Sequence, residues 1–279
     1  MPTQHPQRAE SRIAVGVDDS ASSLSAVRLA AREAALQRRP LRLVHALNWI
    51  PDGSAPPDGE LRPAAEALVG RATAVAAEVA PRIDTSVEIG EGTLTATLLR
   101  ESHLAGLIVM GDGDLSHHTC LPMDAPAVQL AARANCTVML ARGEQRCGLG
   151  PVVVGVDRSA GGERALEFAF EAASHRHAEL VVVRVTDGDS PDADDVTAAQ
   201  LAEAVGPWQE KHPGVSTRRQ VLPGEPAAVM VAQSQSAGLL VVGARGEHPL
   251  RGPLGPVAQA VLHHSPCPVV IVRDIPAIV

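Results

Sequence analysis

Residues 13–20 read IAVGVDDS, and residues 152–159 read VVVGVDRS. In both stretches an apolar run passes through a Gly and reaches an Asp, with a Ser two residues later. A second pair of blocks follows them in the chain, because AGLIVMG at 105–111 returns as AGLLVVG at 237–243. Blocks that return in the same order at similar spacing indicate an internal repeat.

A third pair of blocks extends the repeat to the end of each half. NCTVMLAR at 135–142 matches PCPVVIVR at 266–273, and the stretch RCGLGP at 146–151 lies between the two halves. A glycine-containing stretch outside the repeated blocks is typical of a domain boundary. We therefore expect two homologous domains, at 1–146 and 150–279.

Within each half, short apolar runs alternate with longer amphipathic stretches. Runs that are apolar almost throughout are typical of strands covered on both faces. They fall at 12–17, 41–46, 86–90, 106–111 and 136–141, and again at 151–156, 179–185, 216–222, 238–243 and 267–272. Strand–helix alternation with short turns predicts parallel strands and right-handed crossovers. The predicted fold class is α/β: two tandem Rossmann-like, doubly wound domains, each a five-stranded parallel sheet flanked by helices.

The first helix of each half has an identifiable start and an inward face. Ser20 or Ser22 can cap the helix of the first half. The residues expected to face inward are Leu24, Val27, Leu29 and Ala31, and in the second half Ala165, Leu166, Phe168 and Ala169. The stretches 49–63 and 186–195 are rich in Pro, Gly and Asp, which predicts surface loops.

Composition narrows the functional classes. The 279 residues are 45% hydrophobic but include only two Phe, two Trp and no Tyr, so Val, Leu, Ile and Ala must build the core. The formal net charge is −8, and Lys211 is the single lysine. The arginines are scattered among acids and form no basic stripe, which disfavours electrostatically driven binding of nucleic acid.

The cysteines and the apolar runs suggest a location. Four cysteines without a CxxC spacing favour a reducing compartment; they are Cys120, Cys136, Cys147 and Cys267. No apolar run approaches the roughly 20 residues that a membrane helix needs. The N-terminal MPTQHPQRAESR lacks the apolar region of a signal peptide. We expect a soluble, cytoplasmic protein without a membrane partner.

The sheet topology predicts where a ligand would bind. Ligands of doubly wound sheets bind beyond the carboxyl ends of the strands, where the strand order reverses. That rule brings Asp18 and Asp157 beside Gly111 and Gly243, which end the fourth strand of each half. A carboxylate there can accept hydrogen bonds from a sugar hydroxyl or an amino group. Equally, it can complement the dipole of the following helix, and both roles stay open.

These motifs together resemble the universal stress protein family. The resemblance rests on the two GVD starts, the repeat, GARG at 243–246 and VAQAVLHHSPCPVVIVR at 257–273, and it covers essentially the whole chain as a tandem member. It implies the adenine nucleotide alpha hydrolase-like form of the fold. It also implies either an ATP-binding or a non-binding protein, because the ATP-binding members carry G-x-x-G, a spacer, and then Gly followed by Ser or Thr.

The second domain keeps most of the ATP-binding pattern. Its candidate nucleotide-binding residues, by resemblance, are Asp157, Val185, Gly243, Arg245, Gly246, Gly252, Gly255, Pro256 and Val257. The implied cofactor is ATP, with or without Mg. Pro256 stands at the hydroxyl position and has no N–H, so we expect a weakened phosphate site. Arg245 can offset part of that loss by charge attraction, or it can be a solvated loop residue.

The first domain departs further from the pattern. Its weaker equivalents are Asp18, Ala46 and Gly111. Counting back from Cys136 and Cys267 without gaps places Asp124 opposite Gly255 and Ala125 opposite Pro256; Asp112 and Asp114 lie in the same loop. Carboxylates repel a phosphate, so this domain is not expected to hold a triphosphate.

Three functional hypotheses remain. The first is a stress-associated regulatory protein, not a conventional enzyme, that binds ATP or a related adenine nucleotide in its second domain. The second is an interaction or dimerisation module without nucleotide, and the third is a slow nucleotide hydrolase. HHTC at 117–120 fits a polar loop better than a metal site, because no second ligand pair is evident. The expected partners are a second copy of the chain and an unidentified regulatory protein. Within the chain, the last strands of the two halves, 136–141 and 267–272, are expected to pair or pack across a pseudo-twofold axis, as in related dimers.

Overall fold

The computed structural model describes residues 12–47, 58–113, 115, 118–142, 150–186, 191–247 and 252–273. The chain forms two compact units, Met1–Gly113 with Asp124–Ala141, and Asp114–Met123 with Arg142–Val279. The predicted boundary between 146 and 150 lies among residues 143–149, outside the described residues, so the domain limits stay a prediction. Each unit is considered by itself.

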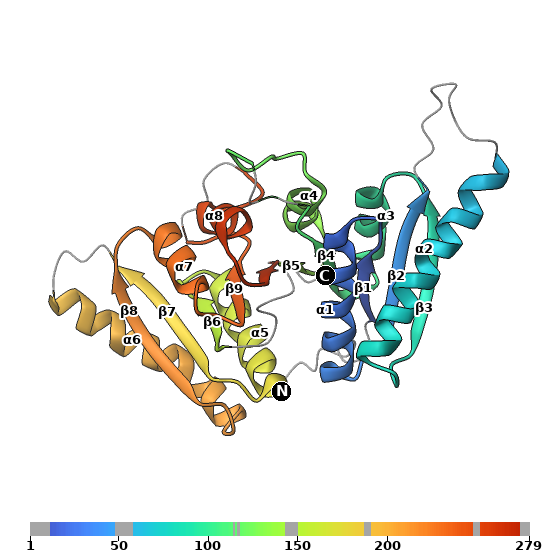
Figure 1. The fold of residues 1–279 in the computed structure, drawn as a ribbon. Helices are drawn as coiled ribbons and strands as arrows, with labels where there is room; N and C mark the ends of the chain where they lie inside the picture. The colour runs from blue at the N-terminus through green and yellow to red at the C-terminus, as the bar shows by residue number, and fades with distance from the viewer. Residues whose placement is uncertain are drawn as a thin grey trace. The chain divides into compact units, whose positions relative to one another are not determined.

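The first unit is a parallel sheet with helices on both faces (Figure 1). Its elements are β1 (Arg12–Gly16), α1 (Ala21–Gln37), β2 (Leu41–Leu47), α2 (Asp58–Val79), β3 (Thr85–Glu91), α3 (Leu94–Glu101), β4 (Ala105–Gly111), α4 (Pro126–Arg133) and β5 (Thr137–Ala141). The strand order is β3-β2-β1-β4-β5, and neighbouring strands are parallel. Helices α1 and α2 pack together, and α3 packs against α4.

The second unit repeats this arrangement. Its elements are β6 (Val152–Gly155), α5 (Ala160–Arg176), β7 (Leu180–Thr186), α6 (Pro191–Lys211), β8 (Thr217–Pro223), α7 (Pro226–Ser234), β9 (Leu239–Gly243), α8 (Pro256–His264) and β10 (Val269–Val272). The order β8-β7-β6-β9-β10 matches that of the first unit, again with parallel neighbours. The predicted fold class is confirmed, and each predicted strand coincides with an observed one to within about two residues at either end.

The core is built from small aliphatic side chains, as the composition predicts, with one aromatic exception. Phe170 is completely buried, and its ring lies 6.4 Å from that of Trp208 on α6, centroid to centroid. Phe168, which the hydrophobic pattern predicts on the inward face, is only partly buried. Both residues lie on α5 half a turn apart, so the hydrophobic pattern alone does not decide which ring fills the core.

Two of the predicted loops are shorter than expected. Helix α2 begins at Asp58, inside the predicted loop 49–63, and α6 begins at Pro191, inside 186–195. Proline is well tolerated in the first turn of a helix, so Pro191 marks a helix start and not a continuing loop. In the described part of the chain, no helix combines the length and apolar character needed to cross a membrane.

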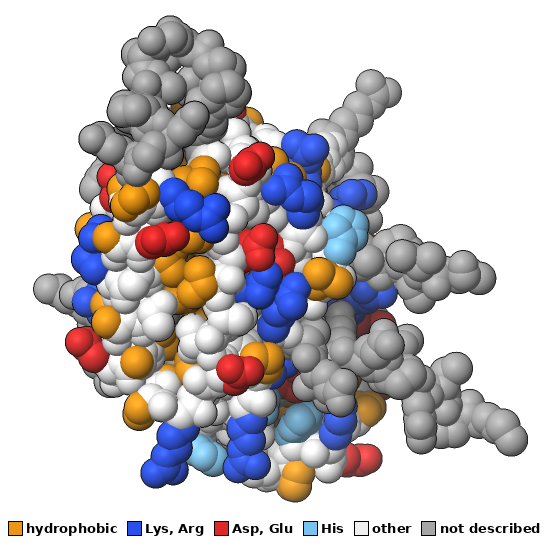
Figure 2. All heavy atoms as spheres, turned by 90° about the vertical axis from the view of Figure 1, so that its right-hand side faces the viewer, with side chains coloured by type: hydrophobic (Ala, Val, Ile, Leu, Met, Phe, Trp, Pro, Cys, Tyr) orange, Lys and Arg blue, Asp and Glu red, His pale blue; other side chains and the backbone are white. Residues whose placement is uncertain are grey.

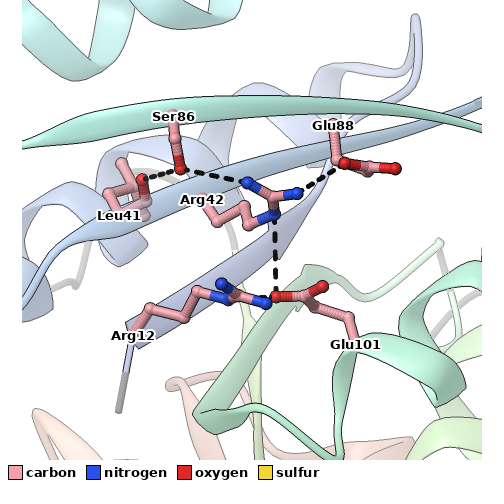
Figure 3. A network of polar contacts seen from close by, with 6 residues as sticks. All are labelled: Arg12, Leu41, Arg42, Ser86, Glu88 and Glu101. Carbon is pink, nitrogen blue, oxygen red and sulfur yellow. Dashed lines mark hydrogen bonds and ion pairs between the residues drawn. The ribbon is translucent and has the colours of Figure 1, made fainter. Parts of the chain in front are cut away.

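A charged network crosses the first unit near the start of its strands (Figure 3). Glu101, at the end of α3, accepts a hydrogen bond from Arg12 Nε at 2.5 Å and lies 3.8 Å from Arg42 Nε. Arg42 also binds Glu88 on β3 at 2.5 Å. The network therefore links three neighbouring strands to one helix. On the face drawn in Figure 2, basic side chains are spread among acidic and apolar ones.

Candidate functional site

The candidate site of the second unit starts from Asp157, which follows the buried strand β6. Ser159 is the N-cap of α5, and both its N–H (3.0 Å) and its hydroxyl (2.5 Å) donate to Asp157 Oδ1. The other oxygen, Oδ2, accepts from the N–H of Glu247 at 2.7 Å. Asp157 therefore joins the end of β6 to the loop that follows β9. These hydrogen bonds also support a structural role for Asp157, in which its charge complements the dipole of the following helix, α5.

The glycines of this loop allow close approach of backbone segments. A Cβ on Gly246 would lie 2.7 Å from Asp157 Oδ2, and one on Gly243 would lie 3.2 Å from the carbonyl oxygen of Gly161 on α5. A side chain at either position would crowd these atoms and require them to shift. A phosphate ligand is thus not needed to explain why glycine occupies either position.

The N-terminus of α8 lies beside the same loop. Gly255 is the N-cap residue, its N–H donates to the Ala244 carbonyl at 2.8 Å, and no side chain caps the helix. Pro256 takes the first helical position, so the missing N–H is one that the helix itself does not use. Val257 carries the next N–H along the helix. This end of α8 is therefore positive and only partly supplied with donors.

The structure brings together some of the predicted residues and separates others. Asp157, Gly243, Arg245, Gly246 and Gly255 form one contiguous group around the loop. Val185 is outside this group, near the end of the neighbouring strand β7, where it pairs with Leu222 of β8. The side chain of Arg245 is exposed, and Gly252 is an exposed loop residue with φ +153°.

Sequence reasoning missed the residues that fix the loop. They are Ser159, Gly161, Gly162, Arg184 and Glu247. Glu247 Oε2 lies 3.9 Å from Arg184 Nη2, which places the carboxylate over the end of β7. The sequence does indicate Ser159, because DRS at 157–159 repeats DDS at 18–20 and a Ser two residues after an Asp is typical of a helix N-cap. No comparable pattern marks Arg184 or Glu247.

The first unit has the same cap but a different loop. Ser20 donates its N–H (2.9 Å) and hydroxyl (2.5 Å) to Asp18 Oδ1 and caps α1, so Ser20 and not Ser22 is the cap. Gly111 is packed against α1, where a Cβ would lie 2.7 Å from the backbone of Ser22. Ala46 pairs with Gly90 on β3. Among the described residues, no group donates to the second oxygen of Asp18.

One predicted correspondence between the halves is wrong. The N-cap residues of the matching helices are Ala125 and Gly255, and each accepts the first helical bond, from Gln129 and Gln259 respectively, at 3.0 Å. Ala125 is therefore opposite Gly255, and Pro126 is opposite Pro256. The gap-free count placed Asp124 there because α8 is one residue longer than α4. Asp124 remains in the approach to the helix, and Asp114 lies outside the described residues.

The HHTC stretch lies only partly within the described residues, since His117 is not among them. The carbonyl of His118 accepts from His263 Nε2 at 2.9 Å, and the rings of His263 and His264 are 4.1 Å apart. Burial, then His263, then Arg142 lower the pKa of His264. No group of three metal-binding side chains occurs in the described part of the chain.

Comparisons with known proteins agree with this architecture. The sequence model described as "Universal stress protein family" matches residues 11–142 and again 149–273. The chain is 32% identical over 287 residues to universal stress protein Rv2623 of Mycobacterium tuberculosis (strain ATCC 25618 / H37Rv), covering 94% of this chain and 96% of the relative. It is 30% identical over 292 residues to universal stress protein Rv2005c of the same strain, covering 96% and 98%.

A solved structure shows the same fold. The crystal structure of a universal stress protein from Archaeoglobus fulgidus DSM 4304 is similar with a TM-score of 0.76 at 18% identity, over 95% of this chain and 97% of that one. At this identity the likeness concerns the fold alone.

Proposed function

The chain belongs to the universal stress protein family, and from that premise we propose that its second unit binds ATP or a related adenine nucleotide and acts as a regulatory protein. One observation carries the proposal. Asp157, the Gly243–Gly246 turn and the start of α8 converge where β6 and β9 end side by side. This is the switch point at which doubly wound sheets bind ligands.

The proposed roles follow the chemistry of each group. Asp157 would accept hydrogen bonds from the adenosine part, beside the end of β7 at Val185. The phosphates would lie near Gly252 and Gly255, where the N-terminus of α8 attracts negative charge. Arg245 is exposed and free to approach a phosphate from solvent. A Mg ion bound with ATP would be held by the phosphates rather than by a protein cage.

The alternative proposal is an interaction module without nucleotide, and Pro256 favours it. Proline removes one backbone donor from the helix end, and no side chain supplies another. In both proposals the protein is cytoplasmic, self-associates and binds a regulatory partner, and they differ in whether the loop holds a ligand. Slow hydrolysis of a bound nucleotide is a second alternative, and it applies only if the loop binds one.

A direct test starts from the purified, full-length protein. Denaturation followed by mass spectrometry of the released small molecules should identify an adenine nucleotide, or titration of ligand-free protein with ATP should show saturable binding. If neither a released nucleotide nor binding at millimolar ATP is found, the interaction module is the better account.

A further inference from the structure

Glu247 reaches across two neighbouring strand ends of the second unit. Its N–H donates to Asp157 Oδ2 at 2.7 Å, at the end of β6, and its carboxylate lies 3.9 Å from Arg184 Nη2, on β7. Strands β6 and β7 are direct neighbours in the sheet. One residue therefore spans the crevice edge at which the adenosine part of the proposed ligand would lie.

The environment of Arg184 explains why Glu247 is held there. The Arg184 side chain is only 15% exposed, whereas that of Glu247 is 40% exposed. Within the described ranges, Glu247 is the one group found to pair with this guanidinium. A charge largely removed from water is unfavourable unless an opposite charge lies close to it. Arg184 thus draws the Glu247 carboxylate toward β7, and the Glu247 N–H stays over Asp157.

Asp157 has little capacity left for a ligand in this arrangement. Its Oδ1 already accepts two hydrogen bonds from Ser159. Its Oδ2 accepts from Glu247, and the backbone of Gly246 packs so closely that a Cβ would lie 2.7 Å from that oxygen. A carboxylate oxygen offers about two acceptor positions, so the protein fills both of Oδ1 and one of Oδ2, and the remaining one lies beside Gly246.

The first unit lacks this arrangement. His45 occupies the position in β2 that Arg184 occupies in β7, the fifth residue of a seven-residue strand. Its Nδ1 bonds the carbonyl of Val17, directly after β1, at 2.8 Å, and not the loop that follows β4. The contact between strand, loop and carboxylate is thus a property of the second unit alone among the residues described.

We propose that Gly246 and Glu247 form a latch that closes the second-unit site in the absence of ligand. In the closed form the Glu247 N–H donates to the Asp157 carboxylate, which adenosine would otherwise use as an acceptor. The Arg184–Glu247 ion pair holds Glu247 in this position. Adenosine binding requires the N–H to leave Asp157. Loss of the ion pair therefore favours the open, binding-competent form and raises apparent affinity. The latch concerns regulation of the same site and rests on the proposed function.

Two substitutions in the full-length protein test the latch. Arg184→Gln and Glu247→Gln each remove one charge of the ion pair, and Arg218→Gln is the matched control. Arg218 pairs with Glu179 at 3.4 Å in the same unit, with its side chain 55% exposed. The readouts are hydrogen exchange of the residue 247 amide, by NMR, and adenosine affinity, by calorimetry. Arg184→Gln is the cleaner variant for exchange, because it leaves the sequence around residue 247 unchanged.

We expect both variants to speed exchange at residue 247 and to tighten adenosine binding, each by roughly two- to fivefold, the range for a partly exposed ion pair. Arg218→Gln should change neither. Unchanged exchange would overturn the latch whatever the affinities are. Faster exchange with weaker adenosine binding in Arg184→Gln would also overturn it, because Arg184 would then contact the ligand. Faster exchange with no adenosine or ATP binding by any variant would support the latch contact and overturn the proposed function.

Discussion

Pro256 begins α8 and offers neither an N–H nor a hydroxyl to a phosphate. Serine at this position would supply both, without moving the Gly255 cap. We expect Pro256→Ser to tighten ATP binding by roughly tenfold or more and to leave adenosine binding nearly unchanged, since one charge-assisted bond is gained at the phosphates alone. Calorimetric titration of the full-length protein with each ligand measures the difference.

Pro126 provides the matched control, because it occupies the first position of α4 in the first unit. Pro126→Ser should leave ATP affinity unchanged. If Pro256→Ser has no more effect on ATP than Pro126→Ser has, Pro256 is only a helix-start residue and the proposed phosphate site is wrong.

Residue identities near the site could be predicted from the sequence only in part. Asp157, Gly243, Gly246 and Gly255 belong to repeated or spaced motifs, and they do lie together. Glu247 lies 90 positions from Asp157 in the chain, and their contact depends on how a loop folds over a strand end. Periodicity and propensity describe local structure, so they carry no information about such a contact.

At the scale of elements, the Glu101 network joins α3 to β1, β2 and β3 (Figure 3). The Glu101 side chain is 9% exposed, and its removal leaves Arg12 and Arg42 without their shared carboxylate. Breaking one partner of a buried pair is costly, and partial exposure of the arginines reduces that cost. We expect Glu101→Ala to lower the free energy of unfolding by about 2–3 kcal/mol in urea titrations.

Glu179→Ala is the comparison, because Glu179 pairs with Arg218 at 3.4 Å and both side chains are well exposed. It should cost less than about 1 kcal/mol. Equal effects of the two substitutions would mean that the Figure 3 network contributes no more than a surface pair.

The end of α8 makes the stability of the protein sensitive to acid. Burial, His263 and Arg142 lower the pKa of His264, so the unfolded chain binds its proton more readily than the folded one. The contribution of His264 to the free energy of unfolding is therefore constant above about pH 6.5. It is lost as the pH falls from there toward the lower pKa of the folded protein. His264→Gln should flatten the loss of thermal stability as the pH falls below about 6.5. An unchanged slope would show that His264 titrates alike in both states.

The strands could be predicted closely, whereas helix ends could not. Strands such as β4 and β9 are buried on both faces, and their continuous apolar runs end at a glycine that packs against a helix. The start of α4 was misplaced by one residue, because a count from Cys136 ignores that α4 and α8 differ in length. Helix length depends on capping at both ends, which a gap-free comparison does not include.

At the scale of the whole molecule, one topology is used twice with different polar chemistry. Both units share the strand order and the Asp–Ser cap of the first helix. In the second unit Asp157 also binds the loop after β9, whereas the described residues give Asp18 no such partner. The acids of the first loop predict weaker phosphate binding by the first unit, and that stays a prediction. The loop contact of Asp157 is a separate difference between the units, which the sequence does not predict.

We propose that one adenine nucleotide binds per chain, in the second unit. The most direct measurement is calorimetric titration of full-length protein with ATP, for wild type and for Asp18→Ala and Asp157→Ala, after urea unfolding has shown that each variant is folded. We predict one ATP site per chain in wild type and in Asp18→Ala. In Asp157→Ala the ATP affinity should fall by about tenfold or more, because a charged hydrogen-bond partner is removed. Binding that is lost in Asp18→Ala and retained in Asp157→Ala would contradict the account.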